Sequence, residues 1–253
     1  MGNVKIIFLK RKSVYLAVCI AIASFLVIIS LFIHYEILSV NTFIDPQSGI
    51  IVIDPGHGGI DGGTNKEGVL EKEINLDIGK KLKLLLEQKG YTVIMTREED
   101  ISLDNFDNSG KNRHQRDLNA RANIINTSTA QLFLSIHVNC NLKKPSTDGA
   151  IVFYSDKFEQ NKLLAYFVQR ALNNMEVNKK QRTVHNPVQA KYFVLNKTNI
   201  PGVIVETAFI SNKAERQEMV KDTFKEEIAK AIILGMEQYL NESNKVYKKI
   251  SSN

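Results

Sequence analysis

Short apolar runs alternate with longer amphipathic segments between residues 49 and 240, and this alternation limits the possible folds most strongly. Compact apolar runs bounded by turn residues predict buried strands at 49–53, 91–95, 131–136, 149–154, 192–195 and 202–205. Apolar residues at helical spacing predict helices at 71–89, 116–125 and 161–175, and one or two more within 213–240. We therefore expect a single α/β domain, with a mostly parallel or mixed twisted sheet and helices on both faces.

The N-terminal region predicts a transmembrane helix ahead of this domain. Residues 14–33 are uncharged and mostly apolar, and about 20 such residues are enough to cross a bilayer. Four basic residues precede the stretch, which favours a cytoplasmic N-terminus and an extracytoplasmic remainder. The stretch exceeds the roughly 7–15 residues of a signal-peptide core, so a retained anchor is favoured over a cleaved signal. The predicted organisation is a cytoplasmic basic segment at 1–12, a transmembrane anchor or signal-anchor at 13–36, a linker at 37–48, the folded domain at 49–242 and a flexible tail at 243–253.

Charge and cysteine content exclude two classes of protein. The formal net charge is +6, and because four of these charges lie in the first twelve residues, the rest of the chain carries only +2. A domain whose positive and negative charges nearly balance is not expected to bind nucleic acid. One of the two cysteines, Cys19, lies within the apolar stretch, so no intrachain disulfide with Cys140 is expected. Stability must come from a packed core, which about 200 residues can supply.

Four short motifs carry the side chains that are best suited to metal binding and catalysis. They are Asp54-Pro-Gly-His-Gly-Gly59, Glu71-Lys-Glu-Ile-Asn-Leu76, Ser135-Ile-His-Val-Asn139 and Val205-Glu-Thr-Ala-Phe209. Three of these motifs follow or end predicted strands, and the second opens a predicted helix. Because ligands gather beyond the carboxyl ends of strands in open α/β sheets, we expect the side chains of His57, Glu71, His137 and Glu206 to converge.

This set of side chains predicts a zinc hydrolase. Two imidazoles and one carboxylate can hold a catalytic Zn²⁺ and leave a position for water, and a second carboxylate can act as the base. In this interpretation His57, Glu71 and His137 bind the metal, and Glu206 is the base.

The residues alone leave alternatives open. Each histidine could be structural, Glu71 could merely favour the helix N-terminus, and Glu73 is a rival ligand two residues on. The glycine-rich loop around His57 lacks the pattern of a phosphate-binding loop. Cys140 is interpreted as structural, because a fourth protein ligand would close the site.

The four motifs, together with Thr96-Arg97, Arg121-Ala-Asn123 and Ser211-Asn212, resemble the zinc-dependent N-acetylmuramoyl-L-alanine amidases of the Amidase_3 family over about residues 50–240. The resemblance implies one Zn²⁺ per domain, held by His57, Glu71 (rather than Glu73) and His137, with Glu206 as the catalytic base. It makes 49–242 a zinc amidase domain, which hydrolyses the amide between N-acetylmuramic acid and the L-Ala of the peptidoglycan stem peptide. Asn139 and Arg121 are expected to hold the loop and helix around the metal through hydrogen bonds.

The segment 100–116, together with Arg116-Asp-Leu118 before Arg121, is similar to the corresponding part of the germination-specific amidases that act on spore cortex. Such enzymes clip stem peptides so that muramic-δ-lactam can form. The resemblance implies an extracytoplasmic catalytic domain, membrane-anchored or secreted, with the forespore intermembrane space as one location.

The expected partners are peptidoglycan, the membrane through the N-terminal helix, and an accessory or localising protein, but no nucleic acid. Three rival functions remain. They are a non-catalytic peptidoglycan-binding domain, a zinc peptidase that acts on the stem peptide itself, and a membrane-tethered scaffold whose zinc is purely architectural.

Overall fold

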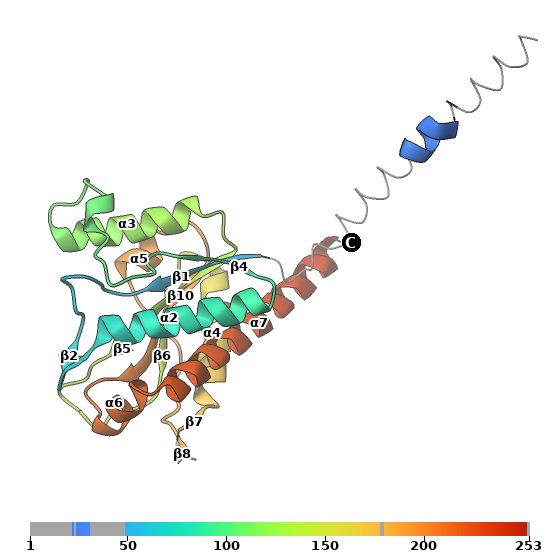
Figure 1. Cartoon of the computed structure of the whole chain (residues 1–253). Helices are drawn as coiled ribbons and strands as arrows, with labels where there is room; N and C mark the ends of the chain where they lie inside the picture. The colour runs from blue at the N-terminus through green and yellow to red at the C-terminus, as the bar shows by residue number, and fades with distance from the viewer. Residues whose placement is uncertain (1–21, 23, 31–48, 178–179, 252–253) are drawn as a thin grey trace, which may run out of the picture. The chain divides into compact units, whose positions relative to one another are not determined.

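A computed structural model describes residues 22, 24–30, 49–177 and 180–251 (Figure 1). The chain divides into two compact units, Met1–Gln47 and Ser48–Asn253. In the first unit, Ile22 and residues 24–30 are helical and their large apolar side chains are exposed. The predicted segments 1–12 and 37–48, and most of the predicted span 13–36, lie outside the described residues. Among the residues that are described, we find no helix with the length and apolar character needed to cross a membrane.

The second unit is built on one mixed sheet of six strands. In spatial order the strands are β4 (Thr92–Met95), β1 (Ile50–Pro55), β5 (Leu132–Asn139), β10 (Gly202–Phe209), β6 (Ile151–Tyr154) and β9 (Val188–Gln189). The first four are parallel, β6 is antiparallel to β10, and β9 is parallel to β6. Two short ribbons accompany the sheet: β2 (Asn65–Lys66) with β3 (Val69–Leu70), and β7 (Glu176–Val177) with β8 (Lys180–Gln181).

Helices cover both faces of the sheet, as the α/β prediction requires. The larger core joins one face to α2 (Glu71–Gln88), α4 (Glu159–Asn173) and α7 (Asp222–Ser251). The smaller core joins the other face to α3 (Arg113–Thr127) and α5 (Phe193–Lys197). A 3₁₀ turn at Asp104–Phe106 precedes α3, and α6 (Lys213–Met219) follows β10. Alternation along β1 explains the two cores, because Ile51 and Ile53 enter the first and Val52 enters the second.

One predicted strand is wrong. Residues 192–195 do not form a strand, because Phe193–Lys197 is the short helix α5. A run of four apolar residues is too short for periodicity to separate a strand from a helical turn. Here Val194 and Leu195 are adjacent on one side of the turn and both pack into the smaller core.

Three elements end later than the sequence indicated. Strands β5 and β10 continue past His137 and Glu206, and α7 continues past residue 240 to Ser251. A flexible tail at 243–253 stays a prediction. At the start of this last segment, Lys245 and Glu242 lie one helical turn apart and form a 3.2 Å ion pair.

The contact between α4 and α7 depends on Gly235. A Cβ atom at this position would lie 2.5 Å from the Cα of Val168 and 2.7 Å from the carbonyl oxygen of Phe167. Gly235→Ala should therefore lower the free energy of unfolding by about 1–2 kcal/mol, although alanine is the better helix former, because overpacking costs more than helix propensity gains. Urea denaturation measures this loss. The neighbouring Leu234→Ala, at a half-exposed site, serves as the control, and equal stability of both variants would contradict the prediction.

Candidate active site

The loop after β1 places His57 at the carboxyl edge of the sheet. His57 adopts a left-handed backbone conformation with φ of 62°, between Gly56 and the positive-φ Gly58. Buried arginines hold the turn from two sides: Arg97 donates to the carbonyl oxygens of Pro55 and Gly56, each at 3.0 Å, and Arg121 donates to that of His57 at 2.7 Å. The loop is thus fixed by hydrogen bonds to its own backbone.

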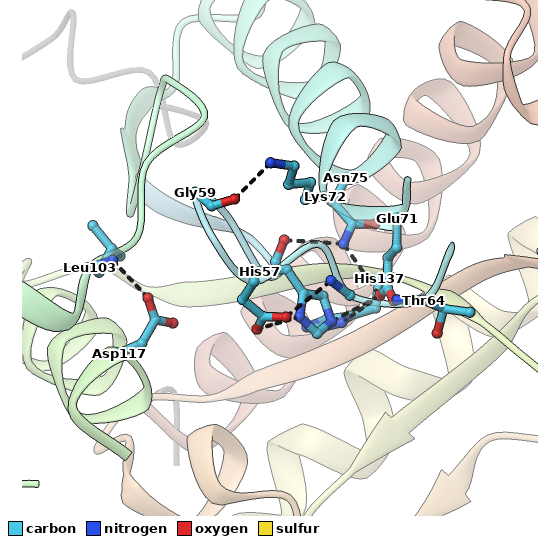
Figure 2. Close-up of polar contacts among 12 residues, drawn as sticks. His57, Gly59, Thr64, Glu71, Lys72, Asn75, Leu103, Asp117 and His137 are labelled. Carbon is cyan, nitrogen blue, oxygen red and sulfur yellow. Dashed lines mark hydrogen bonds and ion pairs between the residues drawn. The ribbon is translucent and has the colours of Figure 1, made fainter. Parts of the chain in front are cut away.

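Glu71 is the first residue of α2, and its carboxylate is buried between the two histidines. Its Oε1 lies 3.2 Å from His57 Nε2 and 3.0 Å from His137 Nδ1, and it accepts from the backbone N–H of Val138 at 3.1 Å (Figure 2). Its Oε2 accepts from the backbone N–H of Thr64 at 2.8 Å. Glu73, the rival ligand in the sequence, is exposed on the opposite side of this helical turn. The geometry therefore brings Glu71, and not Glu73, to the histidines.

His57, Glu71 and His137 form a group that could hold a metal ion. One ligand atom from each lies within 4.8 Å of the other two, and the imidazole rings meet edge to face with centroids 5.1 Å apart. Asp61 Oδ2 lies 2.8 Å from His57 Nδ1, whereas Glu71 faces the other ring nitrogen, Nε2. Two nitrogen donors, one carboxylate oxygen and a carboxylate behind one imidazole form a set that suits Zn²⁺.

The glycines of the two loops leave the space that this group needs. A Cβ atom on Gly56 would lie 2.2 Å from Cε1 of His137, and one on Gly63 would lie 2.6 Å from Oε2 of Glu71. Any larger residue at these positions would displace a candidate ligand, which explains Gly56 before His57 and Gly63 in the loop that leads to Glu71.

Charges within the group are strongly coupled. Burial alone would lower the pKa of His57, but hydrogen bonds and charges from Glu71 and Asp61 outweigh it and raise that pKa to about 9. Burial would raise the pKa of Glu71, yet the bonds and charges of His137 and His57 hold it far below its ordinary value. The carboxylate of Glu71 therefore stays ionised and offers a negative ligand to a cation.

Glu206 lies on β10 directly beside His137 of β5. Both residues line a cavity of about 430 Å³ together with His57 and Glu71. The Oε2 atom of Glu206 is buried, and no group among the described residues hydrogen-bonds to it. Burial raises the pKa of Glu206 to about 7, so the carboxylate can both take and release a proton near neutral pH. The cavity thus contains a candidate base beside the metal-binding group but not within it.

The two residues expected to support the site differ in their contacts. Arg121 is buried and bridges Asp54, at 2.7 Å, and Asp117, at 2.6 Å, while it holds the His57 loop. Asn139 lies at the end of β5 on the cavity wall, and its side chain accepts from the backbone N–H of Cys140 at 2.7 Å. Arg121 therefore contacts the ligand loop directly, whereas Asn139 shapes the turn after His137.

Asp54 organises the floor of the cavity, although it was not among the predicted site residues. Its buried carboxylate accepts from Thr96 and Ser135, each at 2.7 Å, as well as from Arg121. Burial would raise the pKa of Asp54, but the charge of Arg121 and these hydrogen bonds lower it. A carboxylate at the end of an apolar strand was the available signal, because such a group must be paired when it is buried.

The walls of the cavity include further side chains that the sequence did not indicate. Tyr192 and His114 line the cavity. The pKa of Tyr192 is raised, mainly by burial and to a lesser extent by the charge of Glu206. Cys140 also lines the cavity but does not belong to the group that could hold a metal. Asp117 accepts from the backbone N–H of Leu103 at 2.7 Å (Figure 2). Because it also accepts from Arg121 at 2.6 Å, it ties the loop after β4 to that arginine.

Arg121→Met should strongly destabilise the domain, because it leaves Asp54 buried without its counter-charge. Removal of one partner of a buried ion pair costs about 3–5 kcal/mol, and we expect a loss of this size in the free energy of unfolding of metal-free protein. Arg113→Met is the matched control on the same helix, since Arg113 is half-exposed and its ion pair with Asp104 should contribute less than about 1 kcal/mol. Comparable losses in both variants would contradict the importance of the buried pair.

Comparison with known families identifies the surrounding domain. Residues 51–238 match the Amidase_3 family, described as N-acetylmuramoyl-L-alanine amidase. The chain is 34% identical over 201 residues to the germination-specific N-acetylmuramoyl-L-alanine amidase of Bacillus subtilis, which covers 78% of this chain and 82% of that protein. It is 32% identical to the amidase LytC of the same organism, over 75% of this chain but only 35% of LytC.

Solved structures agree with this relationship. The CwlD amidase of Clostridioides difficile, in complex with the GerS lipoprotein, superposes with a TM-score of 0.68 at 36% identity, over 77% of this chain and 99% of that one. An N-acetylmuramoyl-L-alanine amidase from Clostridium difficile 630 superposes with a TM-score of 0.66 at 28% identity, over 77% of this chain and 98% of that one.

Proposed function

Because the chain belongs to the Amidase_3 family of N-acetylmuramoyl-L-alanine amidases, and is a hydrolase of that kind, we propose that it uses zinc to cleave the amide between the lactyl group of N-acetylmuramic acid and the L-Ala of the stem peptide. The observation that carries the proposal is the meeting of His57, Glu71, His137 and Glu206 at one cavity. The first three would hold the ion, and Glu206 would transfer the proton.

Zn²⁺, when bound, polarises the scissile carbonyl and makes a water molecule more acidic. Glu206 accepts a proton from the attacking water as the carbon–oxygen bond forms, and it returns that proton to the leaving nitrogen as the carbon–nitrogen bond breaks. Its buried, unpartnered oxygen and its pKa of about 7 suit both steps. Glu71 supplies the negative charge of the ligand set, and Arg121 and Asp61 keep His57 in place.

We propose spore cortex as the wall on which the enzyme acts, and release of stem peptides for muramic-δ-lactam formation as its role. The similarity to the germination-specific amidase supports this narrower assignment.

We also propose that the catalytic domain works outside the cytoplasm, where an N-terminal anchor at 13–36 holds it at a membrane. The uncharged stretch at 14–33 and the basic residues before it support the anchor. The CwlD amidase was solved with a lipoprotein, and this favours a lipoprotein as the accessory partner of the present chain. Full activity of the purified chain with no added protein would contradict a partner that is required for turnover.

Product analysis separates the proposed activity from its rivals. Purified peptidoglycan from vegetative walls and from spore cortex is incubated with the protein, and the new chemical groups are identified by mass spectrometry. New L-Ala amino termini together with free lactyl carboxylates are expected, in greater amounts from cortex. New carboxylates within the stem peptide would indicate a zinc peptidase, and retention of the glycan without any product would indicate a binding domain.

A further inference from the structure

A second hollow of about 430 Å³ lies on the α3 side of the sheet, next to the active-site cavity. It is bounded by α3, by the loop before it and by α5, and Phe193 of α5 lines both the hollow and the active-site cavity. Two hydrogen bonds fix its two helical walls to each other: Asn126 donates to the carbonyl oxygen of Lys197 at 3.1 Å and accepts from the N–H of Asn199 at 2.6 Å. The hollow and the active-site cavity are therefore neighbours that share the side chain of Phe193 as a wall.

The wall formed by α3 is a stripe of amide side chains. Gln115, Asn119, Asn123 and Asn126 follow one another at helical spacing, and all four line the hollow. Asparagine disfavours a helix interior because its side chain competes for backbone hydrogen bonds. Three asparagines within 15 residues therefore weaken α3, and neither the metal group nor Arg121 requires them.

Asp107 orients two of these amides. Its Oδ1 accepts from Nδ2 of Asn119 at 3.4 Å, and its Oδ2 accepts from Nδ2 of Asn123 at 2.9 Å. The amide nitrogens thus point to Asp107 and, for Asn119, also to the hydroxyl oxygen of Ser109 at 3.0 Å. Within the described part of the chain, neither amide oxygen accepts a hydrogen bond. Asp107 and Lys197 are the only charged residues among those that line the hollow, and their charges are opposite. The lining offers several donors and acceptors, one aromatic ring and no net charge.

We propose that this hollow binds the glycan chain of the substrate, beside the N-acetylmuramic acid whose peptide is removed. The inference rests on the proposed function, because the scissile amide then joins a peptide to a chain of amino sugars that must leave the cavity along the surface. Amide groups match the hydroxyl and acetamido groups of such sugars, and the ring of Phe193 offers an apolar face for a pyranose ring.

The test is binding of a peptide-free glycan to the full chain, which requires no turnover. The probe is a tetrasaccharide of alternating N-acetylglucosamine and N-acetylmuramic acid without stem peptides, and its dissociation constant is measured by calorimetry. Gln115→Ala combined with Asn119→Ala should weaken binding at least about tenfold, because two side chains that can hydrogen-bond to the sugars are removed. Gln160→Ala, at an exposed position on α4, is the matched control and should bind as the wild type does.

Phe193→Leu serves as a second test variant if the double variant does not fold. It should also bind the tetrasaccharide at least about tenfold more weakly, because the aromatic face is lost. A wild-type dissociation constant above about 10 mM, or equal binding by the wild type and the folded variants, would overturn the proposal. Failure of the proposed function looks different: the chain would bind the tetrasaccharide normally and yet release no peptide from muropeptides.

Discussion

Glu206→Gln is expected to lower the rate of amide hydrolysis by about 10²–10⁴-fold, the range that a positioned acid–base group contributes, while the protein keeps its zinc. Glutamine preserves the shape of the side chain but cannot accept the proton of the attacking water. Zinc should be retained because Glu206 lines the cavity but does not belong to the group formed by His57, Glu71 and His137. Steady-state hydrolysis of muropeptides and metal analysis of the same sample measure both quantities.

Glu176→Gln is a suitable control for this variant, since Glu176 is exposed on β7 and does not line the active-site cavity. Its activity and zinc content should equal those of the wild type. Loss of zinc from Glu206→Gln would show that Glu206 is a ligand, and unchanged turnover would mean that another group acts as the base or that the zinc is architectural.

Glu71→Gln is expected to abolish tight zinc binding. Substitution of residues that only hydrogen-bond to metal ligands already lowers metal affinity by about 10–100-fold. Loss of a direct ligand should therefore lower zinc affinity by more than about 100-fold. Glu71 is also the only carboxylate in the group, and its bonds to Val138 and Thr64 hold it in place between the histidines. A competition titration of zinc between the protein and a chelator measures the change, and hydrolysis should fall in parallel with zinc content.

Glu73→Gln is the matched control, because it makes the same substitution on the exposed side of the same helical turn. It should bind zinc as the wild type does. Full occupancy in Glu71→Gln together with loss of zinc in Glu73→Gln would move the ligand to Glu73 and contradict the geometry of the site.

Sequence patterns were sufficient to predict which side chains meet. His57, His137 and Glu206 follow or lie in parallel strands, and the carboxyl ends of such strands share an edge, so their convergence followed from the α/β alternation. Spacing alone could not choose between Glu71 and Glu73, since both lie in the first turn of α2. The choice depends on which one the helix directs inward, and that is a property of tertiary packing.

Other parts of the site depend on contacts that a local pattern does not contain. Asp54 and Arg121 are 67 residues apart in the chain, and their pairing across the floor of the cavity appears only in the fold. The helix α5 was mistaken for a strand because four apolar residues fit both periods, and the error concealed the role of Tyr192 and Phe193 as cavity walls. The amide stripe of α3 was visible in the sequence, but only the neighbouring α5 turns it into a hollow.

The measurement that tests the account most directly is a zinc titration of metal-free protein, with muropeptide products followed by mass spectrometry. The account predicts no hydrolysis without zinc, a linear rise in rate that ends at one zinc per chain, and cleavage only between muramic acid and L-Ala. Full hydrolysis in the presence of a chelator, or zinc-dependent cleavage at another bond, would contradict it.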